Sequence, residues 1–362
     1  MKVKRLLAGA LLLGLCLYGA KALQTLRPFV HITPQGDKGC RLLEAPGLLG
    51  AEDIERDPES GTLWITAADR RIERSHRPRQ GALFRFRPGV DAAPVRVPIV
   101  GLSAELRPHG LGLWRGAATP GGPRELRLFT VQHGSEVESV EIFALEPTAG
   151  DGQSLQARHL RSVTSPAFIS LNDVSPVGPE SFYASNDHGR KPPLGFLFED
   201  FLFLSNASVV YFDGQSARRV ASDLRYANGI TADRGGRYVL VAETTAERIS
   251  IFARLPDGGL SPVAHKDLGT APDNFAQDEQ GAYWVAAHPS ALQFLRHAGK
   301  ASSPSASQAL RFVLSEAGQV EQVSIPWQDD GRALSASSVA AVHGSTLYIG
   351  AVFAPGILAC PR

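Results

Sequence analysis

Six short segments of the chain repeat one pattern: a polar residue or polar pair precedes an apolar residue, and a segment rich in aromatic and aliphatic residues follows. The polar positions are Glu52, His109, Asn172, Asn228, Asn274 and Ser338. Their successive intervals of 57, 63, 56, 46 and 64 residues suit four-stranded propeller blades with variable loops better than tighter helical repeats. The repeat therefore predicts an all-β, six-bladed propeller with a central channel.

Residues at the same register of successive blades converge on a propeller's axis, because the innermost strand of each blade lines the channel. Turn signals such as Asp213-Gly214 separate the apolar segments, and long stretches of helical period are almost absent. We therefore expect one propeller domain over residues 23–362, with its functional residues on the axis.

The composition limits the classes of partner. A chain of 362 residues with 43% hydrophobic and 20% charged residues can bury a large core. Its 37 Lys and Arg residues nearly balance its 36 Asp and Glu residues, which leaves a net charge of +1. This balance gives no reason to expect a nucleic acid as partner.

The first 22 residues have the layout of an export signal, in which positive charges precede an apolar run. Lys2, Lys4 and Arg5 come before the apolar run 6–20, and Ala20-Lys21-Ala22 offers an A-x-A cleavage site. The run is shorter than the roughly 20 residues that span a bilayer. Residues 1–22 are therefore expected to act either as a cleaved signal peptide or as an uncleaved anchor, which predicts a secreted, extracytoplasmic or membrane-tethered protein.

Three cysteines are present, and one of them, Cys16, lies in that N-terminal segment. Cys40 lies near the start of the folded part and Cys360 near its end. In an exported protein such a pair favours a disulfide. A propeller closes its ring by pairing its first and last strands in one blade, and this bond would lock that closure.

The repeat positions carry oxygen donors rather than a familiar catalytic motif. Zinc motifs, a G-x-S-x-G elbow, a Walker loop and an EF-hand loop are missing from the sequence. The candidate donors are Glu52, Asp53, Asn172, Asp173, Asn228, Asp273 and Asn274. Hard oxygens in that number suit calcium, which takes about six to eight of them.

Two of the repeat positions carry adjacent donors. Neighbouring residues of an extended segment point in opposite directions, so Glu52 and Asp53 can serve two ions at different depths. Asn172 and Asp173 repeat this arrangement in another blade. Two doublets at one register favour metal binding over a turn or cap, which is the usual role of an Asn-Asp pair.

An ordered set of motifs carries a resemblance to a known family. The motifs are Glu52-Asp53-Ile54, Pro108-His109-Gly110-Leu111, Leu171-Asn172-Asp173-Val174, Asn186-Asp187-His188, Ala227-Asn228-Gly229-Ile230, Asp273-Asn274 and His288-Pro289. From about residue 43 to residue 360 the chain resembles the paraoxonase family of calcium-dependent lactonases and arylesterases. The resemblance implies a six-bladed propeller with two calcium ions in its channel, one catalytic and one structural.

The resemblance also implies which residues hold each ion. The matching motifs assign the catalytic ion to Glu52, Asn172, Asn228, Asp273 and Asn274. They assign the deeper structural ion to Asp53, Asp173 and the backbone carbonyl of Leu111. That Asp273 and Asn274 share one ion does not follow from alternation along a strand and rests on the resemblance alone.

The catalytic base implied by the resemblance is His109, with His133 as the second member of a histidine dyad. An imidazole that titrates near 6.5 suits this task at neutral pH. The family's usual proline after the second histidine is Gly134 here, and its free cysteine is Ala287. Candidate residues for the substrate wall are Tyr226, His188, His288 and Phe196.

The segment 192–210 is the most apolar stretch outside the N-terminus. Members of the family place a lid-like amphipathic helix here, and a short helix within 194–204 over the channel mouth would contact a membrane or a lipid-like substrate. A buried strand leading into Val209-Val210-Tyr211-Phe212 fits the same composition, so both alternatives stay open. Asn206-Ala207-Ser208 satisfies the glycosylation sequon, which is a weak signal.

The expected function is calcium-dependent hydrolysis of lactones, acyl-homoserine lactones among them, with aryl esters as secondary substrates. The ion would polarise the carbonyl and the dyad would activate water. Two alternatives stay open: a gluconolactonase-like sugar lactonase with one ion and a polar pocket, and a calcium-stabilised propeller that serves as a non-catalytic scaffold. A preference for short sugar lactones would favour the sugar lactonase. A missing metal ligand or a missing catalytic base would favour the scaffold.

Overall fold

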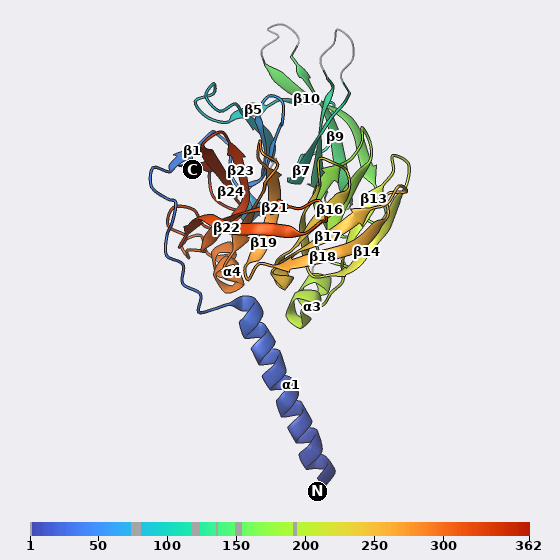
Figure 1. Cartoon of the computed structure of the whole chain (residues 1–362), viewed down its shortest axis with the longest axis vertical. Helices are drawn as coiled ribbons and strands as arrows, with labels where there is room; N and C mark the ends of the chain where they lie inside the picture. The colour runs from blue at the N-terminus through green and yellow to red at the C-terminus, as the bar shows by residue number, and fades with distance from the viewer. Residues whose placement is uncertain (1, 74–80, 118–123, 135–136, 149–153, 191–193) are drawn as a thin grey trace.

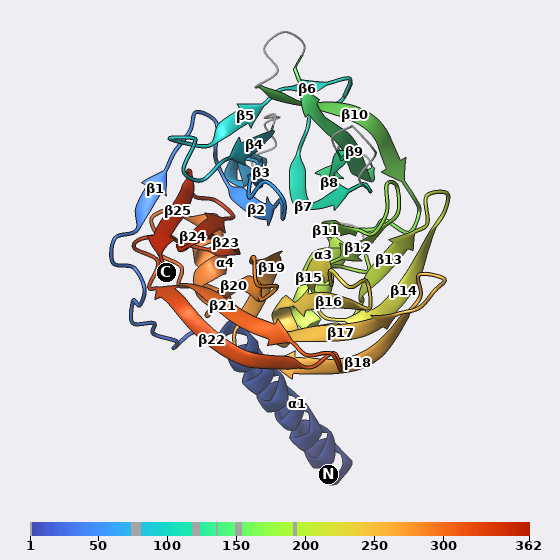
Figure 2. The same ribbon diagram turned by 45° about the horizontal axis from the view of Figure 1, so that its top comes forward.

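The computed structural model of the protein describes residues 2–73, 81–117, 124–134, 137–148, 154–190 and 194–362. Within these ranges the strands form six sheets arranged around a common axis (Figures 1 and 2). This arrangement confirms the six-bladed propeller that the repeat predicts.

Each sheet is one blade, in which the strands follow one another from the axis outwards. The first three blades are β2 (Ala51–Arg56), β3 (Leu63–Ala67), β4 (Ala82–Phe86) and β5 (Val95–Val97); β7 (Pro108–Arg115), β8 (Leu126–His133), β9 (Glu138–Pro147), β10 (Leu155–Thr164) and β6 (Ile99–Val100); and β11 (Leu171–Pro176), β12 (Phe182–Asn186), β13 (Ala207–Phe212) and β14 (Ala217–Leu224).

The other three blades follow the same order. They are β15 (Ala227–Ala232), β16 (Tyr238–Glu243), β17 (Arg248–Arg254) and β18 (Leu260–Asp267); β19 (Ala271–Gln277), β20 (Tyr283–His288), β21 (Ser307–Leu314) and β22 (Val320–Asp329); and β23 (Ser337–His343), β24 (Thr346–Ala351), β25 (Ile357–Pro361) and β1 (Arg41–Leu43). The helical elements are α1 (Lys2–Leu26), α2 (Arg70–Glu73), α3 (Leu194–Leu202), α4 (Ala291–Gly299) and the 3₁₀ turn η1 (Thr244–Ala246).

Every repeat position lies near the start of the innermost strand of its blade. In all six inner strands the pairing register shifts beside this position, for example between Ala51 and Asp53 and between Pro272 and Phe275. A bulge of this kind redirects side chains that strict alternation would send to opposite faces. The repeat is therefore a series of six bulges at one level of the channel, a feature that strand alternation does not reveal.

Aromatic side chains lock neighbouring blades together. Phe182 on β12 lies between Phe129 on β8 and Phe212 on β13, with ring centroids 6.0 and 5.2 Å apart. All three rings are buried, and full burial of one such ring stabilises the fold by about 1.5–3 kcal/mol. Contacts of this type hold the inner strands in a fixed position relative to one another.

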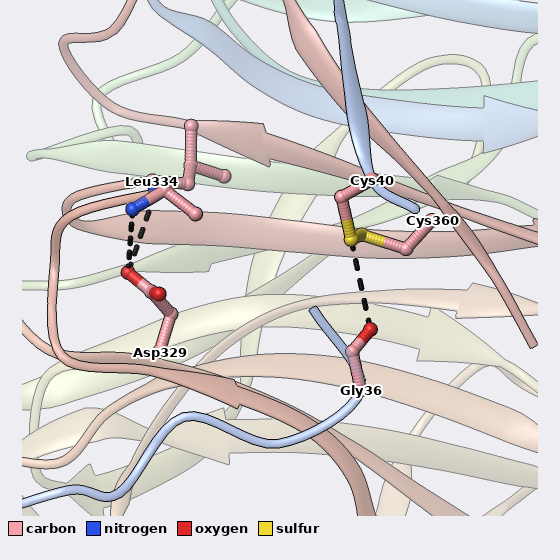
Figure 3. The surroundings of a disulfide bond; sticks show 6 residues. Gly36, Cys40, Asp329, Leu334 and Cys360 are labelled. Carbon is pink, nitrogen blue, oxygen red and sulfur yellow. Dashed lines mark hydrogen bonds between the residues drawn. A yellow bond between two sulfur atoms is a disulfide. The ribbon is translucent and has the colours of Figure 1, made fainter. Parts of the chain in front are cut away.

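The ring closes in the sixth blade, as the cysteine positions predict. Strand β1 pairs antiparallel with β25, with Arg41 opposite Ala359 and Leu43 opposite Ile357. Figure 3 shows the disulfide between Cys40 and Cys360, which joins residues 320 positions apart. The N-terminal strand is thus tied to the blade formed by the C-terminal residues.

Removal of this disulfide is expected to destabilise the protein without changing its fold. A double Cys40→Ser, Cys360→Ser variant should lose about 2–4 kcal/mol of unfolding free energy, because the unfolded chain is no longer restricted by a long covalent loop. Urea unfolding measures this loss. The matched control is Cys16→Ser, which removes an exposed free thiol and should leave the unfolding midpoint unchanged; an equal loss in both variants would contradict the prediction.

The starts of the inner strands, α3 and α4 all lie at one end of the propeller. Strand β12 ends at Asn186 opposite Leu171, shortly before α3, and β20 ends at His288 opposite Ala271, shortly before α4. Helix α1 extends away from the body at this same end (Figure 1). For segment 194–202 the helix alternative is therefore confirmed, and the buried-strand alternative is wrong.

The segment after α1 is attached to α4. Ser290 Oγ donates to Arg27 O at 2.9 Å, and Gln293 Nε2 donates to Val30 O at 3.2 Å. Among the described residues, no helix combines the length and apolar character needed to cross a bilayer. The role of residues 1–22 as signal or anchor stays a prediction.

Candidate active site

The five residues expected to hold the catalytic ion come together at the start of the inner strands. They are Glu52 on β2, Asn172 on β11, Asn228 on β15, and Asp273 and Asn274 on β19, all at most 6% exposed. In four of them a buried side-chain oxygen has no hydrogen-bond partner. These oxygens are Glu52 Oε2, Asn172 Oδ1, Asn228 Oδ1 and Asn274 Oδ1. Four buried acceptors without donors are costly unless something else satisfies them.

The amide side chains are oriented so that their oxygens stay free. Asn172 Nδ2 donates to Asp187 Oδ2 at 3.3 Å, and Asn228 Nδ2 donates to Thr244 Oγ1 at 3.1 Å. Asn274 Nδ2 donates to Glu52 Oε1 at 2.7 Å. An amide whose NH₂ group is held in this way presents only its carbonyl oxygen in the other direction. Asp187 and Thr244 are therefore positioning residues, which the spacing of the sequence alone does not identify.

The two carboxylates of this group differ in environment. Burial by itself raises the pKa of Glu52, but His109, Arg70 and Asn274 outweigh it and lower that pKa to about 2. Burial raises the pKa of Asp273, which His288 opposes and the charge of Glu52 reinforces. His288 Nε2 lies 2.9 Å from Asp273 Oδ2 and so orients this carboxylate.

A cation would fit this donor set. Within the described ranges no three His, Cys, Asp or Glu side chains form a cluster suited to a metal, so any ion here must be held by mixed amide and carboxylate oxygens. Such a set suits calcium, which accepts neutral and charged oxygens in irregular geometry. The unsatisfied oxygens and the buried charges of Glu52 and Asp273 are the structural features that this ion would neutralise.

Asp53 and Asp173 form a second buried site below the first. Their side chains are 2% and 3% exposed. Burial raises the pKa of both carboxyls well above the usual range, and for Asp53 the neighbouring charge of Asp173 adds to this effect. A pair of like charges without a salt-bridge cation is unfavourable in a protein interior. The pair therefore fits the expected deep ion.

The backbone around this pair is closely fitted. Leu111 N donates to Asp53 Oδ2 and Ile230 N to Asp173 Oδ2, both at 2.7 Å. A Cβ atom at Gly110 would collide with Asp173, so glycine is required there. The structure thus brings the Leu111 backbone beside the pair, through its N–H; the expected role of its carbonyl stays a prediction.

The two expected catalytic histidines are in direct contact. His109 Nδ1 lies 2.7 Å from His133 Nε2, and His133 Nδ1 lies 2.8 Å from Glu138 Oε2. Because a carboxylate only accepts, His133 Nδ1 carries a proton; a neutral His133 then accepts at Nε2 from His109 Nδ1. The other ring nitrogen, His109 Nε2, lies 3.3 Å from Glu52 Oε1, to which it donates when it carries a proton.

Glu138 is the member of this chain of contacts that the sequence did not reveal. Burial lowers the pKa of His133, but the hydrogen bond and charge of Glu138 outweigh it and raise that pKa. The side chains of His109 and His133 are 20% and 34% exposed, in contrast to the buried oxygen donors. The three residues form a chain of side-chain contacts from the protein surface to the edge of the candidate metal site.

The expected wall residues surround His188, which follows β12. The ring of Phe196 on α3 stacks on His188 with centroids 3.9 Å apart, and Tyr226 meets it edge-on at 5.1 Å. Tyr226 adopts a positive φ of 51°, which is uncommon for an aromatic residue and places it in the turn just before Asn228. His288 lies apart from this group, beside Asp273 and 4.5 Å from the ring of Phe294.

His188 also ties α3 to the propeller. Its Nδ1 lies 2.8 Å from Asp187 Oδ1 and its Nε2 lies 3.1 Å from Asp200 Oδ1. Burial lowers the pKa of His188, but these two carboxylates outweigh it and raise that pKa to about 10. The folded-state pKa is above the ordinary value of about 6.5, so the stabilisation is complete below that value and is lost as the pH rises through about 10.

Removal of the Asp200 carboxylate should allow α3 to separate from the propeller at a lower pH than in wild type. In Asp200→Asn, the pKa of His188 is expected to fall by about one unit or more, so protection of the α3 amides should be lost at correspondingly lower pH. Hydrogen exchange, corrected for the intrinsic effect of pH, measures this change. Asp213→Asn, which alters an exposed turn residue, is the control; identical protection profiles in Asp200→Asn and the control would contradict the prediction.

Comparisons with known proteins identify the family of the chain. The family model described as Arylesterase matches residues 100–360. Serum paraoxonase/arylesterase 1 of Rattus norvegicus is 29% identical over 335 residues, covering 91% of this chain and 90% of the relative. The Homo sapiens protein of that name is 31% identical over 253 residues, covering 69% of this chain and 67% of the relative.

A solved structure supports the fold alone. The luciferin-regenerating enzyme superposes with a TM-score of 0.51 at 13% identity, covering 90% of this chain and 96% of that chain. Together with the family match and the relatives, the geometry leads to one conclusion: the chain belongs to the paraoxonase/arylesterase family, whose members are ester and lactone hydrolases.

Proposed function

We propose that the protein is a calcium-dependent hydrolase of lactones, with aryl esters as secondary substrates. The observation that carries this proposal is the set of four unsatisfied buried oxygens from Glu52, Asn172, Asn228 and Asn274, next to an accessible histidine pair. Family membership supports ester or lactone hydrolysis in general, and the donor set supports calcium in particular.

The residues of the upper site would hold the catalytic ion. Glu52 and Asp273 contribute negative charge, and three asparagines contribute neutral oxygens. When bound, calcium acts as a Lewis acid that polarises the substrate carbonyl and stabilises the charge that develops on its oxygen, an effect worth several kcal/mol. Asp187, Thr244 and His288 keep these donors aimed at the same point.

We propose that His109 is the general base. Its Nε2 lies at the edge of the site, 3.3 Å from Glu52 Oε1, and it would act as an acceptor once a bound cation engages that carboxylate and a neutral His133, oriented by Glu138, accepts from His109 Nδ1. A water molecule that donates to Nε2 would lose its proton to the imidazole while its oxygen attacks the carbonyl carbon. The proton on His109 is then available for the alkoxide or phenoxide leaving group, and His133 and Glu138 stabilise the imidazolium.

We propose that Asp53, Asp173 and the Leu111 carbonyl hold the second ion, whose role is structural. This follows from the burial of two like charges with only backbone N–H groups as partners. A bound cation offsets their repulsion and so stabilises the arrangement of the inner strands.

The substrate class is proposed from the apolar elements at the same end. The rings of Phe196 and Tyr226 pack on His188, which follows Asp187, the partner of Asn172, and we propose that these two rings form an apolar wall for an acyl tail such as that of acyl-homoserine lactones. We propose that residues 1–22 export the protein or tether it to a membrane, with α1 and α3 on the membrane side. Co-flotation with anionic lipid vesicles tests this, and equal flotation without residues 1–22 would contradict the tether.

A substrate panel tests the proposed function. Wild type and Asp273→Ala are compared on lactones with and without acyl tails, on phenyl acetate and on gluconolactone. We expect the highest kcat/KM on acylated lactones and loss of all activities in the variant. Preference for gluconolactone would favour a sugar lactonase, no turnover would favour a scaffold, and lactone hydrolysis that survives in Asp273→Ala would place the site elsewhere.

A further inference from the structure

The channel has a cavity at the end opposite the active site. It has a volume of about 280 Å³ and is lined by residues of five inner strands, among them the proposed ligands Leu111 and Asp173. Its lining includes Glu55, Arg56, Trp114, Asp173, Arg234 and Gln277. Because Arg234 is exposed while Asp173 is buried, the cavity leads from solvent to Asp173, one member of the deep aspartate pair.

From the active-site end, the deep pair lies behind the donors of the upper site. There the path passes Glu52 and Asn172, which precede Asp53 and Asp173 in their strands and are themselves 2% and 3% exposed. An ion that moved through this end would have to pass between the donors of the upper site. The cavity on the other side reaches Asp173 without crossing any of them.

A carboxyl group and two guanidinium groups line this cavity. Glu55 makes no hydrogen bond or ion pair among the described residues; burial raises its pKa to about 8, and the positive charges of Arg234 and Arg56 oppose that rise. Arg56 is occupied by Glu279 at 3.0 Å. Arg234 is held across two blades, because its Nη2 donates to Asp278 O at 3.0 Å.

We propose that this cavity is the route by which the deep calcium ion enters and leaves. Glu55 is an oxygen ligand that the ion contacts in passage, and the Arg234 guanidinium is a positive charge that retards its escape. This inference rests on the proposed calcium sites, and it assigns their exchange to the mouth of the propeller that takes no part in catalysis. Ion exchange at the deep site therefore does not require release of the upper ion.

The experiment measures calcium release rather than activity. Protein loaded with calcium is mixed rapidly with an excess of the fluorescent chelator Quin-2, and bound calcium is counted by mass spectrometry. Wild type should bind two ions and release them in two phases. Asp273→Ala should remove the phase of the upper ion and so identify the phase of the deep one.

Variants along the cavity should change the deep phase in opposite directions. Arg234→Gln should accelerate it about tenfold, because removal of one nearby charge lowers the barrier to a departing cation, whereas Arg234→Lys should keep the wild-type rate. Glu55→Gln should slow it. The matched control is Arg237→Gln, which removes an exposed charge from the same turn without touching the cavity and should change nothing.

The outcomes separate this inference from the proposed function. If wild type binds two ions and the rate of the deep release phase is unchanged in Arg234→Gln and Glu55→Gln, the route is overturned. The route is also overturned if Arg237→Gln accelerates this phase as much as Arg234→Gln does. If wild type binds one calcium ion and Asp273→Ala binds none, the protein has no deep ion, and the route is overturned as well. A wild type that binds no calcium would overturn the proposed function itself. Equal circular dichroism spectra in saturating calcium establish that each variant is folded.

Discussion

Removal of calcium is expected to abolish hydrolysis of lactones and aryl esters and, in the same sample, to lower thermal stability. Activity depends on the upper donors, whose free oxygens and buried charges have no function without a cation. Stability depends mainly on Asp53 and Asp173, which are left as an uncompensated buried pair. A ligand present at 100 to 1,000 times its dissociation constant stabilises by about 3–4 kcal/mol, so for a domain of this size Tm should fall by on the order of 5 °C.

The measurement compares chelated protein, protein resupplied with calcium, and protein given magnesium. Calcium should restore both activity and Tm, and magnesium should restore neither, because it prefers a smaller and more regular octahedral site. The variant Asp173→Asn should lower Tm more than it lowers the initial activity at saturating calcium. Chelated protein that keeps both activity and Tm would contradict the calcium assignment.

Substitution of the proposed base should reduce kcat with little change in calcium binding. In His109→Gln, kcat for a lactone should fall by about 10²- to 10⁴-fold, the usual contribution of a general base. KM should change much less, because the substrate carbonyl and the metal-site donors remain. Steady-state kinetics and the calcium count are measured on the same preparation.

The control for His109→Gln is His159→Gln. His159 is also paired with a glutamate, Glu141, at 2.7 Å, but it lies on β10 at the outer part of its blade. It should keep wild-type kcat. Glu138→Gln should give an intermediate loss and shift the acidic limb of the pH profile, because the pKa of His133 then loses the contribution that raises it. Wild-type kcat in His109→Gln would mean that another group activates the water.

The sequence was sufficient for the fold because a repeated strand pattern has few solutions. The six repeat positions mark the six inner strands, and Cys40 and Cys360 mark the closure. It was not sufficient for segment 194–202, whose apolar composition suits a helix and a buried strand equally. Tertiary contacts decided that case: the stack of Phe196 on His188 and the pair of His188 with Asp200 fix a helix.

The candidate donors were also predictable, but their arrangement was not. Alternation along a strand explains why Glu52 and Asp53 belong to different levels. It does not explain why Asp273 and Asn274 lie at one level, which depends on the bulge between Pro272 and Phe275. The residues that orient the donors lie at or just after the ends of the second strands: Asp187 after β12, Thr244 after β16 and His288 at the end of β20. The motifs that contain Asp187 and His288 do not show which donor each of them orients.

The sequence by itself determined which residue types reach the channel and at which register, because period and residue chemistry are local properties. Only the tertiary structure decided what surrounds them. Asp187 and Thr244 orient the amide groups of Asn172 and Asn228, Glu138 holds the Nδ1 proton of His133, and a cavity at the other end of the channel reaches Asp173. The physical reason is that these relations join different strands and blades, so they exist only once the ring has closed.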